Sequence, residues 1–160
     1  MRVWKFGDNI NTDYITPGRL NLTDDPRELA KIAFKEYRPE FAEKVKPGDV
    51  IVAGKNFGCG SSRETAPVAL KAAGIRAVIA KSFARIFFRN AINIGLPVII
   101  CKDADKIEEG DVLEINFKEG WIKILNRNLV LRCEKLPDFI LDIIEAGGLV
   151  NYLKKHKGFG

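Results

Sequence analysis

Residues that build metal sites and histidine-based catalytic sites are scarce in this sequence. Glutamine is absent, and methionine and histidine occur once each, the single histidine being His156 in a lysine-rich segment. The three cysteines, Cys59, Cys101 and Cys133, lack the close spacing that zinc sites and small disulfide-linked proteins show. We therefore expect that this chain supplies no metal ligands and no catalytic histidine.

Long apolar runs are missing as well. The longest apolar stretches, such as residues 96–101, fall far short of the roughly 20 residues that a membrane-spanning helix requires. The chain opens with charged residues and has no apolar signal-peptide core. We therefore expect a cytoplasmic protein without a membrane partner.

The composition predicts a single folded domain over residues 1–160. Hydrophobic residues make up 46% of the 160, which suffices for one core in a chain of this length. The formal net charge is +5, but only Lys154, Lys155 and Lys157 form a dense basic run. A nucleic-acid-binding protein usually gathers its positive charge on one face and places aromatic residues among it. Nucleic-acid binding through the basic run therefore has little support, and a solvated surface is the favoured interpretation.

Two patterns of strands follow one another along the chain. The middle alternates between apolar strands and helices, which predicts parallel pairing through helical crossovers. The last third has short strands separated by turn sequences, which predicts an antiparallel meander. The expected strands are 3–6, 50–53, 75–80, 97–101, 112–117, 121–125 and 129–133; the expected helices are 26–37, 64–73, a helix capped by Ser82 that ends at Gly95, and one opened by Pro137. The predicted class is α/β, with a parallel core sheet, helices and an antiparallel annex.

The segment at residues 54–64 carries the strongest functional signal. It reads Gly-Lys-Asn-Phe-Gly-Cys-Gly-Ser-Ser-Arg-Glu and joins an expected buried strand to an expected helix, where parallel sheets bind their ligands. Gly58 and Gly60 allow backbone conformations with positive φ. Two serine hydroxyls, the Arg63 guanidinium and a helix N-terminus together favour an anion such as a carboxylate.

A purely structural interpretation of the same segment is a helix capping box. Ser61 followed three residues later by Glu64 fits that pattern. However, a helix capped by Ser61 would place Pro67 beyond the four amides that have no helical partner, where proline kinks a helix. A helix that begins near Arg63 or Glu64 suits Pro67 better and leaves the serines free for a ligand.

Three segments resemble one known family. Residues 58–64 read Gly-Cys-Gly-Ser-Ser-Arg-Glu, residues 80–86 read Ala-Lys-Ser-Phe-Ala-Arg-Ile and precede Arg-Asn-Ala-Ile-Asn at 89–93, and residues 8–13 read Asp-Asn-Ile-Asn-Thr-Asp. Together they resemble the swivel domain of the aconitase superfamily, a β/β/α domain. The resemblance to its stand-alone form, the small subunits of 3-isopropylmalate dehydratase and of homoaconitase, spans nearly the whole chain.

The resemblance implies a hydro-lyase that moves a hydroxyl between adjacent carbons of a hydroxy diacid through an unsaturated intermediate. It also implies a large-subunit partner, in a heterodimer or heterotetramer, that carries a [4Fe-4S] cluster, so that this chain binds no cofactor and is inactive alone. By position, Ser61 matches the catalytic base, and Asp13 matches an aspartate that assists proton transfer, although Asp13 is also a possible Asx-turn residue. Substrate-binding positions are matched by Ser62 and Arg63, and loop-supporting positions by Gly58, Gly60, Glu64 and Arg85.

The segment after Asp13 corresponds to the family's specificity loop and reads Pro-Gly-Arg-Leu-Asn-Leu-Thr at 17–23. At this place homoaconitase-like members have a sequence that resembles Tyr-Leu-Arg-Thr, and its arginine aligns with Leu22 of this chain. Apolar side chains at Leu20 and Leu22 suit an isopropyl group, whereas an unpaired carboxylate buried there would cost several kcal/mol. The loop therefore favours 3-isopropylmalate and leucine biosynthesis. Two alternatives stay open: a homoaconitase subunit of lysine biosynthesis, with Arg19 reaching the pocket, and a non-catalytic anion-binding module.

Overall fold

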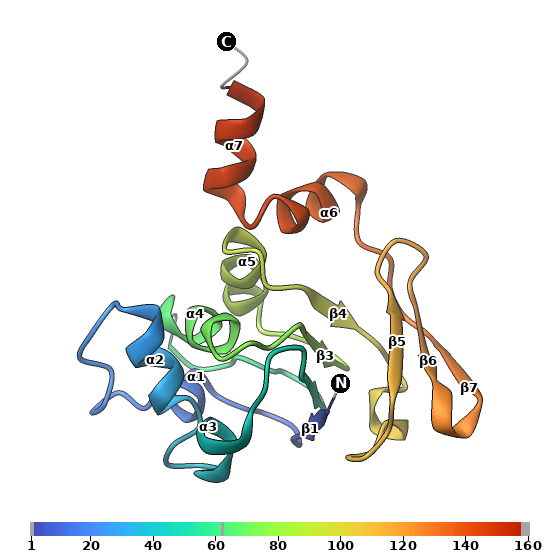
Figure 1. Ribbon diagram of the computed structural model, residues 1–160, viewed down its shortest axis with the longest axis horizontal. Coiled ribbons are helices and arrows are strands. Elements are labelled where there is room, and N and C mark those ends of the chain that lie inside the picture. The colour runs from blue at the N-terminus through green and yellow to red at the C-terminus, as the bar shows by residue number, and fades with distance from the viewer. Residues whose placement is uncertain (1, 62, 158–160) are drawn as a thin grey trace.

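The chain forms three layers, with a parallel sheet between helices and an antiparallel sheet. A computed structural model describes residues 2–61 and 63–157. The parallel sheet has the order β1-β2-β3-β4. Figure 1 shows helices α4 and α5 on one side of it and strands β5 to β7 on the other. The strands are β1 (Val3–Lys5), β2 (Val50–Ala53), β3 (Ala77–Ala80), β4 (Val98–Ile100), β5 (Leu113–Asn116), β6 (Trp121–Ile124) and β7 (Leu129–Arg132).

Both faces of the central strands are buried, which explains their uninterrupted apolar sequences. All four residues of β2 and all four of β3 are buried. Because strand side chains alternate between faces, Ile51 and Val78 join the core under the helices, whereas Val52 and Ile79 join the core against the antiparallel sheet. The predicted α/β class, with its parallel core and antiparallel annex, is confirmed.

The helices lie mostly where the apolar periodicity places them, but several boundaries differ. The expected helix at 26–37 starts at Pro26, with Asp25 as its N-cap, and ends at Ile32, because Phe34 adopts a positive φ of 56°. The expected loop at 7–25 contains a short helix that the sequence analysis missed. The helices are α1 (Thr12–Ile15), α2 (Pro26–Ile32), α3 (Glu40–Lys44), α4 (Thr65–Ala72), α5 (Arg85–Asn93), α6 (Asp138–Glu145) and α7 (Leu149–Lys157).

The prediction that Ser82 caps the third helix is wrong. Helix α5 begins at Arg85, and its N-cap is Ala84, which makes no side-chain capping bond. The Ser82 hydroxyl instead accepts a hydrogen bond from the Asn56 amide at 2.8 Å. Ser82 therefore braces the loop that follows β2. No helix among the described residues is long and apolar enough to cross a membrane.

Candidate active site

Two glycines shape the loop between β2 and α4. Gly58 has a φ of 84° and Gly60 a φ of 92°, a region that side-chain-bearing residues rarely adopt. A Cβ atom at Gly58 would also lie 2.3 Å from Cγ of Phe87, which α5 packs against the loop. Glycine at position 58 is therefore required twice, by its backbone conformation and by the close approach of Phe87.

The segment before α1 pairs with this loop like a short parallel strand. The Gly58 amide donates to the Ile10 carbonyl at 2.7 Å, and the Thr12 amide donates to the Cys59 carbonyl at 2.9 Å. The Thr12 hydroxyl then donates to the Ser61 carbonyl at 2.7 Å. This pairing fixes the register between two segments far apart in sequence and brings Asp13 next to the serine-arginine end of the loop.

Ser61, Arg63 and Asp13 form a connected polar cluster. The Arg63 Nε donates to Ser61 Oγ at 3.2 Å, and Arg63 Nη2 lies 3.5 Å from Asp13 Oδ1. The Gly18 amide donates to the same Asp13 oxygen at 2.8 Å. Because a Cβ at Gly18 would lie 2.9 Å from Arg63 Nη2, the glycine lets the chain pass close over the ion pair. Asn11, rather than Asp13, acts as the Asx residue here, because its side-chain oxygen accepts a hydrogen bond from the Asp13 backbone amide at 2.6 Å.

The start of α4 decides between the two interpretations of the serines. The helix begins at Thr65, and Glu64 is its N-cap with no side-chain capping bond. Pro67 therefore lies in the first turn, where its missing N–H costs nothing. The capping-box interpretation of Ser61 and Glu64 is wrong, and the Ser61 hydroxyl is bonded by Arg63 instead.

A hollow of about 200 Å³ opens beside this cluster. Ser61, Arg63 and Gly60 line one wall, and α5 supplies Arg85 and three further residues to the opposite wall. The described residues offer the Arg85 side chain no ion-pair partner, so its guanidinium is available to a ligand and supports the loop through no such bond. Sequence reasoning missed several lining residues: Thr12, Ile86 and Asn90. The four-residue spacing of Ile86 and Asn90 on one helix face was the available signal.

The specificity loop lies outside this hollow. Leu22 is 86% exposed and Leu20 is half-buried, and neither lines the hollow. Arg19 pairs with Glu36. The loop is tied to α4 through Asn21, whose side-chain amide donates to the Thr65 hydroxyl at 2.9 Å. The structure thus gathers Asp13, Gly58, Gly60, Ser61, Arg63 and Arg85, but not Leu20, Leu22 or Glu64; the predicted site residue Ser62 lies outside the described residues.

Within residues 2–61 and 63–157, no group of three or more histidine, cysteine or acidic side chains is arranged to hold a metal ion. Cys59 is half-buried inside the loop, and Cys101 and Cys133 lie apart from it at the ends of β4 and β7. The Cys101 thiol donates to the Arg132 carbonyl at 3.6 Å, and the neighbouring Cys101 sulfur together with burial raises the pKa of Cys133. The chemistry that this site itself provides is therefore that of a hydroxyl, a carboxylate and guanidinium groups.

Open parallel sheets commonly bind ligands at loops that follow the carboxyl ends of their strands, and guanidinium groups suit anionic ligands. Comparison with known families identifies the class of protein: the aconitase C-terminal domain family matches residues 8–103. Because the match covers more than half of the sequence, the chain belongs to the aconitase C-terminal domain family.

Relatives of the chain carry names that are more specific than the name of this family. The isopropylmalate/citramalate isomerase small subunit of Methanocaldococcus jannaschii is 59% identical over 155 residues, which cover 96% of this chain and 92% of the relative. The 3-isopropylmalate dehydratase small subunit 1 of Methanopyrus kandleri is 57% identical, with 96% and 91% covered. The crystal structure of 3-isopropylmalate dehydratase from M. jannaschii matches with a TM-score of 0.94 and 54% identity, covering 99% of this chain and 94% of that one.

Proposed function

We propose that this chain is the small subunit of a 3-isopropylmalate dehydratase, a hydro-lyase that interconverts 2- and 3-isopropylmalate together with a large subunit. The observation that carries the proposal is the Arg63–Ser61 hydrogen bond at the edge of an arginine-lined hollow. The names and nearly full-length similarity of the relatives support the same assignment. Residues 1–160 then form one swivel domain, and the enzyme works in the cytoplasm in leucine biosynthesis.

Ser61 is the proposed base. Its Oγ takes the proton from the carbon beside a substrate carboxylate, the C–H electron pair becomes the new double bond, and the hydroxyl leaves the adjacent carbon as water after it gains a proton delivered through Asp13. Rehydration in the opposite orientation completes the isomerisation. A serine hydroxyl is a weak base unless its alkoxide is stabilised. The Arg63 Nε at 3.2 Å supplies a charged donor to that oxygen, and the N-terminus of α4 adds a favourable dipole.

The arginines of the site bind the two carboxylates of the substrate. Arg63 and Ser62 hold the carboxylate next to the carbon that loses its proton, and Arg85 reaches the second carboxylate from the opposite wall. The Arg85 guanidinium can bind a carboxylate through two parallel hydrogen bonds, which fixes orientation as well as charge, whereas Nε of Arg63 already donates to Ser61. Asn90, one turn along α5 from Ile86, adds an amide donor to the same wall.

Asp13 is proposed to assist proton transfer to the departing hydroxyl. Its side chain is 56% exposed and is positioned by Gly18 and Arg63, so a proton can reach it from a partner subunit. A [4Fe-4S] cluster held by the large subunit would supply the Lewis acid for the departing hydroxyl. Because Asp13 faces outward beside Ser61, the large subunit is expected to cover this edge of the hollow in a heterodimer or heterotetramer.

The substrate is proposed to be a diacid with an apolar substituent. Isopropylmalate and citramalate, the two substrates in the name of the M. jannaschii relative, both have two carboxylates and an alkyl group. Leu20 and Leu22 would pack against that group once a large subunit closes the site. A third carboxylate, as in homoisocitrate, would find leucine at position 22, so the homoaconitase alternative is disfavoured. Citramalate is the second candidate substrate, because a methyl group fits wherever an isopropyl group does.

The test is anaerobic turnover by this chain reconstituted with its iron-sulfur partner. We expect isomerisation of 3-isopropylmalate, slower or comparable turnover of citramalate and little of homoisocitrate, and none by the isolated chain. Ser61→Ala should abolish turnover while size-exclusion chromatography still shows the complex. Substantial activity of this variant would contradict the assignment of the base. Tight binding of a carboxylate by the chain alone, without any partner-dependent turnover, would favour the binding-module alternative instead.

A further inference from the structure

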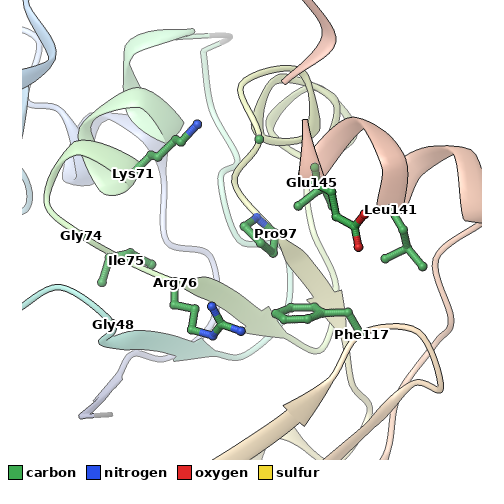
Figure 2. A pocket seen from close by; sticks show the side chains of 11 residues that line it. Gly48, Lys71, Gly74, Ile75, Arg76, Pro97, Phe117, Leu141 and Glu145 are labelled. Carbon is green, nitrogen blue, oxygen red and sulfur yellow. The ribbon is translucent and has the colours of Figure 1, made fainter. Parts of the chain in front are cut away.

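A second cavity, of about 540 Å³, opens at the other end of the parallel sheet (Figure 2). Its walls come from the segments that lead into β3 and β4, from the end of α4, from Phe117 after β5 and from α6. None of its lining residues takes part in the candidate active site. Its volume lies in the range of about 300–1,000 Å³ that is usual for small-molecule sites.

The lining combines an apolar surface with side chains of opposite charge. Ile75, Pro97, Phe117, Leu141 and Ile144 supply the apolar part. The charged residues are Lys71, Arg76 and Glu145. Figure 2 shows Arg76 and Glu145 on opposite sides of Pro97, with the Phe117 ring below Pro97 and beside Arg76. The cavity therefore offers a positive group, a negative group and an apolar surface between them.

Of the two basic groups, only Arg76 is free to bind a ligand. Lys71 Nζ already donates to the Ile94 carbonyl at 2.6 Å and to the Gly147 carbonyl at 3.3 Å. Arg76 Cζ lies 5.6 Å from the centroid of the Phe117 ring, and stacking on a ring leaves the in-plane donors of a guanidinium available. Throughout residues 2–61 and 63–157, neither Arg76 nor Glu145 has an ion-pair partner.

We propose that this cavity binds an apolar α-amino acid. Arg76 holds the carboxylate through a two-point contact, Glu145 holds the ammonium group, and the side chain lies between Pro97, Leu141 and Ile144. A dicarboxylate would bring its second carboxylate against Glu145, so the hydroxy diacids proposed for the active site do not fit here. The proposal does not depend on the proposed function, because it uses neither the loop at 54–64 nor a partner subunit.

The ligand series tests each charge separately on the full chain. Amide NMR spectra would be recorded with L-leucine, with 4-methylpentanoate, which lacks the ammonium group, and with 3-methylbutylamine, which lacks the carboxylate. We expect L-leucine to shift the amide signals of Ile75, Arg76 and Glu145, and each analogue to bind about tenfold or more weakly, since each loses one charge-assisted contact. No binding of L-leucine, or equal binding of all three compounds, would overturn the proposal.

Paired variants locate the two contacts. Arg76→Gln should weaken L-leucine binding by about tenfold or more and leave the binding of 3-methylbutylamine unchanged. Glu145→Gln should weaken L-leucine binding to a similar extent and leave the binding of 4-methylpentanoate unchanged. Asp142→Asn is the matched control on α6, because Asp142 is exposed and does not line the cavity. Unchanged affinity in both test variants would contradict the site. Shifts of the same amides with protein concentration alone would instead assign the cavity to a second copy of the chain.

Discussion

At the scale of single residues, Arg63 connects the proposed base to the proposed proton carrier. Arg63→Lys keeps the charge but loses the planar fork that reaches Ser61 and Asp13 at once. We expect kcat of the reconstituted enzyme to fall about 10²-fold or more, as when one stabilising donor is removed from a reacting oxygen. Arg89→Lys is the control, because Arg89 is exposed and does not line the hollow. Equal kcat values for the two variants would refute this role of Arg63.

Leu22 carries the prediction on substrate choice. Because its side chain is 86% exposed in the isolated chain, Leu22→Arg should leave the fold intact and add a cation to the specificity loop. We expect the ratio of kcat/KM for homoisocitrate over 3-isopropylmalate to rise by about tenfold or more, since a tricarboxylate gains a partner for its third carboxylate. Leu22→Met controls for a change of shape without charge. An unchanged ratio would mean that the loop does not reach the substrate.

At the scale of elements, Gly58 couples the catalytic loop to α5. Gly58→Ala meets both a positive φ and the ring of Phe87, so we expect a loss of about 2–5 kcal/mol in the free energy of unfolding, from backbone strain and overpacking together. Gly7→Ala is the matched control, because no atom lies within 4 Å of the added Cβ. Denaturant unfolding of both variants measures the difference. Similar losses at the two positions would argue against the tight contact with Phe87.

Asp111 makes the turn before β5 sensitive to pH. Burial raises the pKa of this carboxyl, but hydrogen bonds from Arg127, Asn126 and the Glu108 amide outweigh it and lower the pKa below 3.8. A carboxyl with a lowered pKa stabilises the fold above its ordinary pKa and loses that contribution as pH falls through the lowered value. Below about pH 4, wild-type stability should therefore decline more steeply than that of Asp111→Asn. Parallel pH profiles of melting temperature would exclude this role.

The elements show how far sequence alone reaches. The apolar strands and the start of α4 near Glu64 were predictable, because strand alternation and the place of Pro67 in a first helical turn are local properties. The Ser82 cap was not, since its hydroxyl is taken by Asn56 from a distant loop. Likewise, the loop residues of the site followed from their sequence pattern, whereas Ile86 and Asn90 depend on how α5 packs against the loop. Contacts between segments distant in sequence set these features, and no local propensity encodes them.

At the scale of the whole molecule, the parallel sheet is shared by both hydrophobic cores. Residues of β2 and β3 alternate between the core under the helices and the core against the antiparallel sheet, so neither layer can be removed without exposing the other face of the same strands. Cooperative unfolding of small domains rests on such shared burial. The three layers should therefore unfold as one unit, as expected if residues 1–160 form a single domain.

The two tryptophans report on the two sheets separately. Trp4 on β1 is buried in the core under the helices, and Trp121 lies on β6 of the antiparallel sheet. Unfolding of Trp4→Phe and Trp121→Phe, each followed by the fluorescence of the remaining tryptophan and by circular dichroism, should give coincident transitions within each variant. Ile122→Ala, which truncates a fully buried side chain of the antiparallel sheet, should shift both tryptophan signals together by about 2–5 kcal/mol. If Trp121 alone responded at lower denaturant, the antiparallel sheet would be a separate folding unit, because the parallel sheet would then keep its core without it.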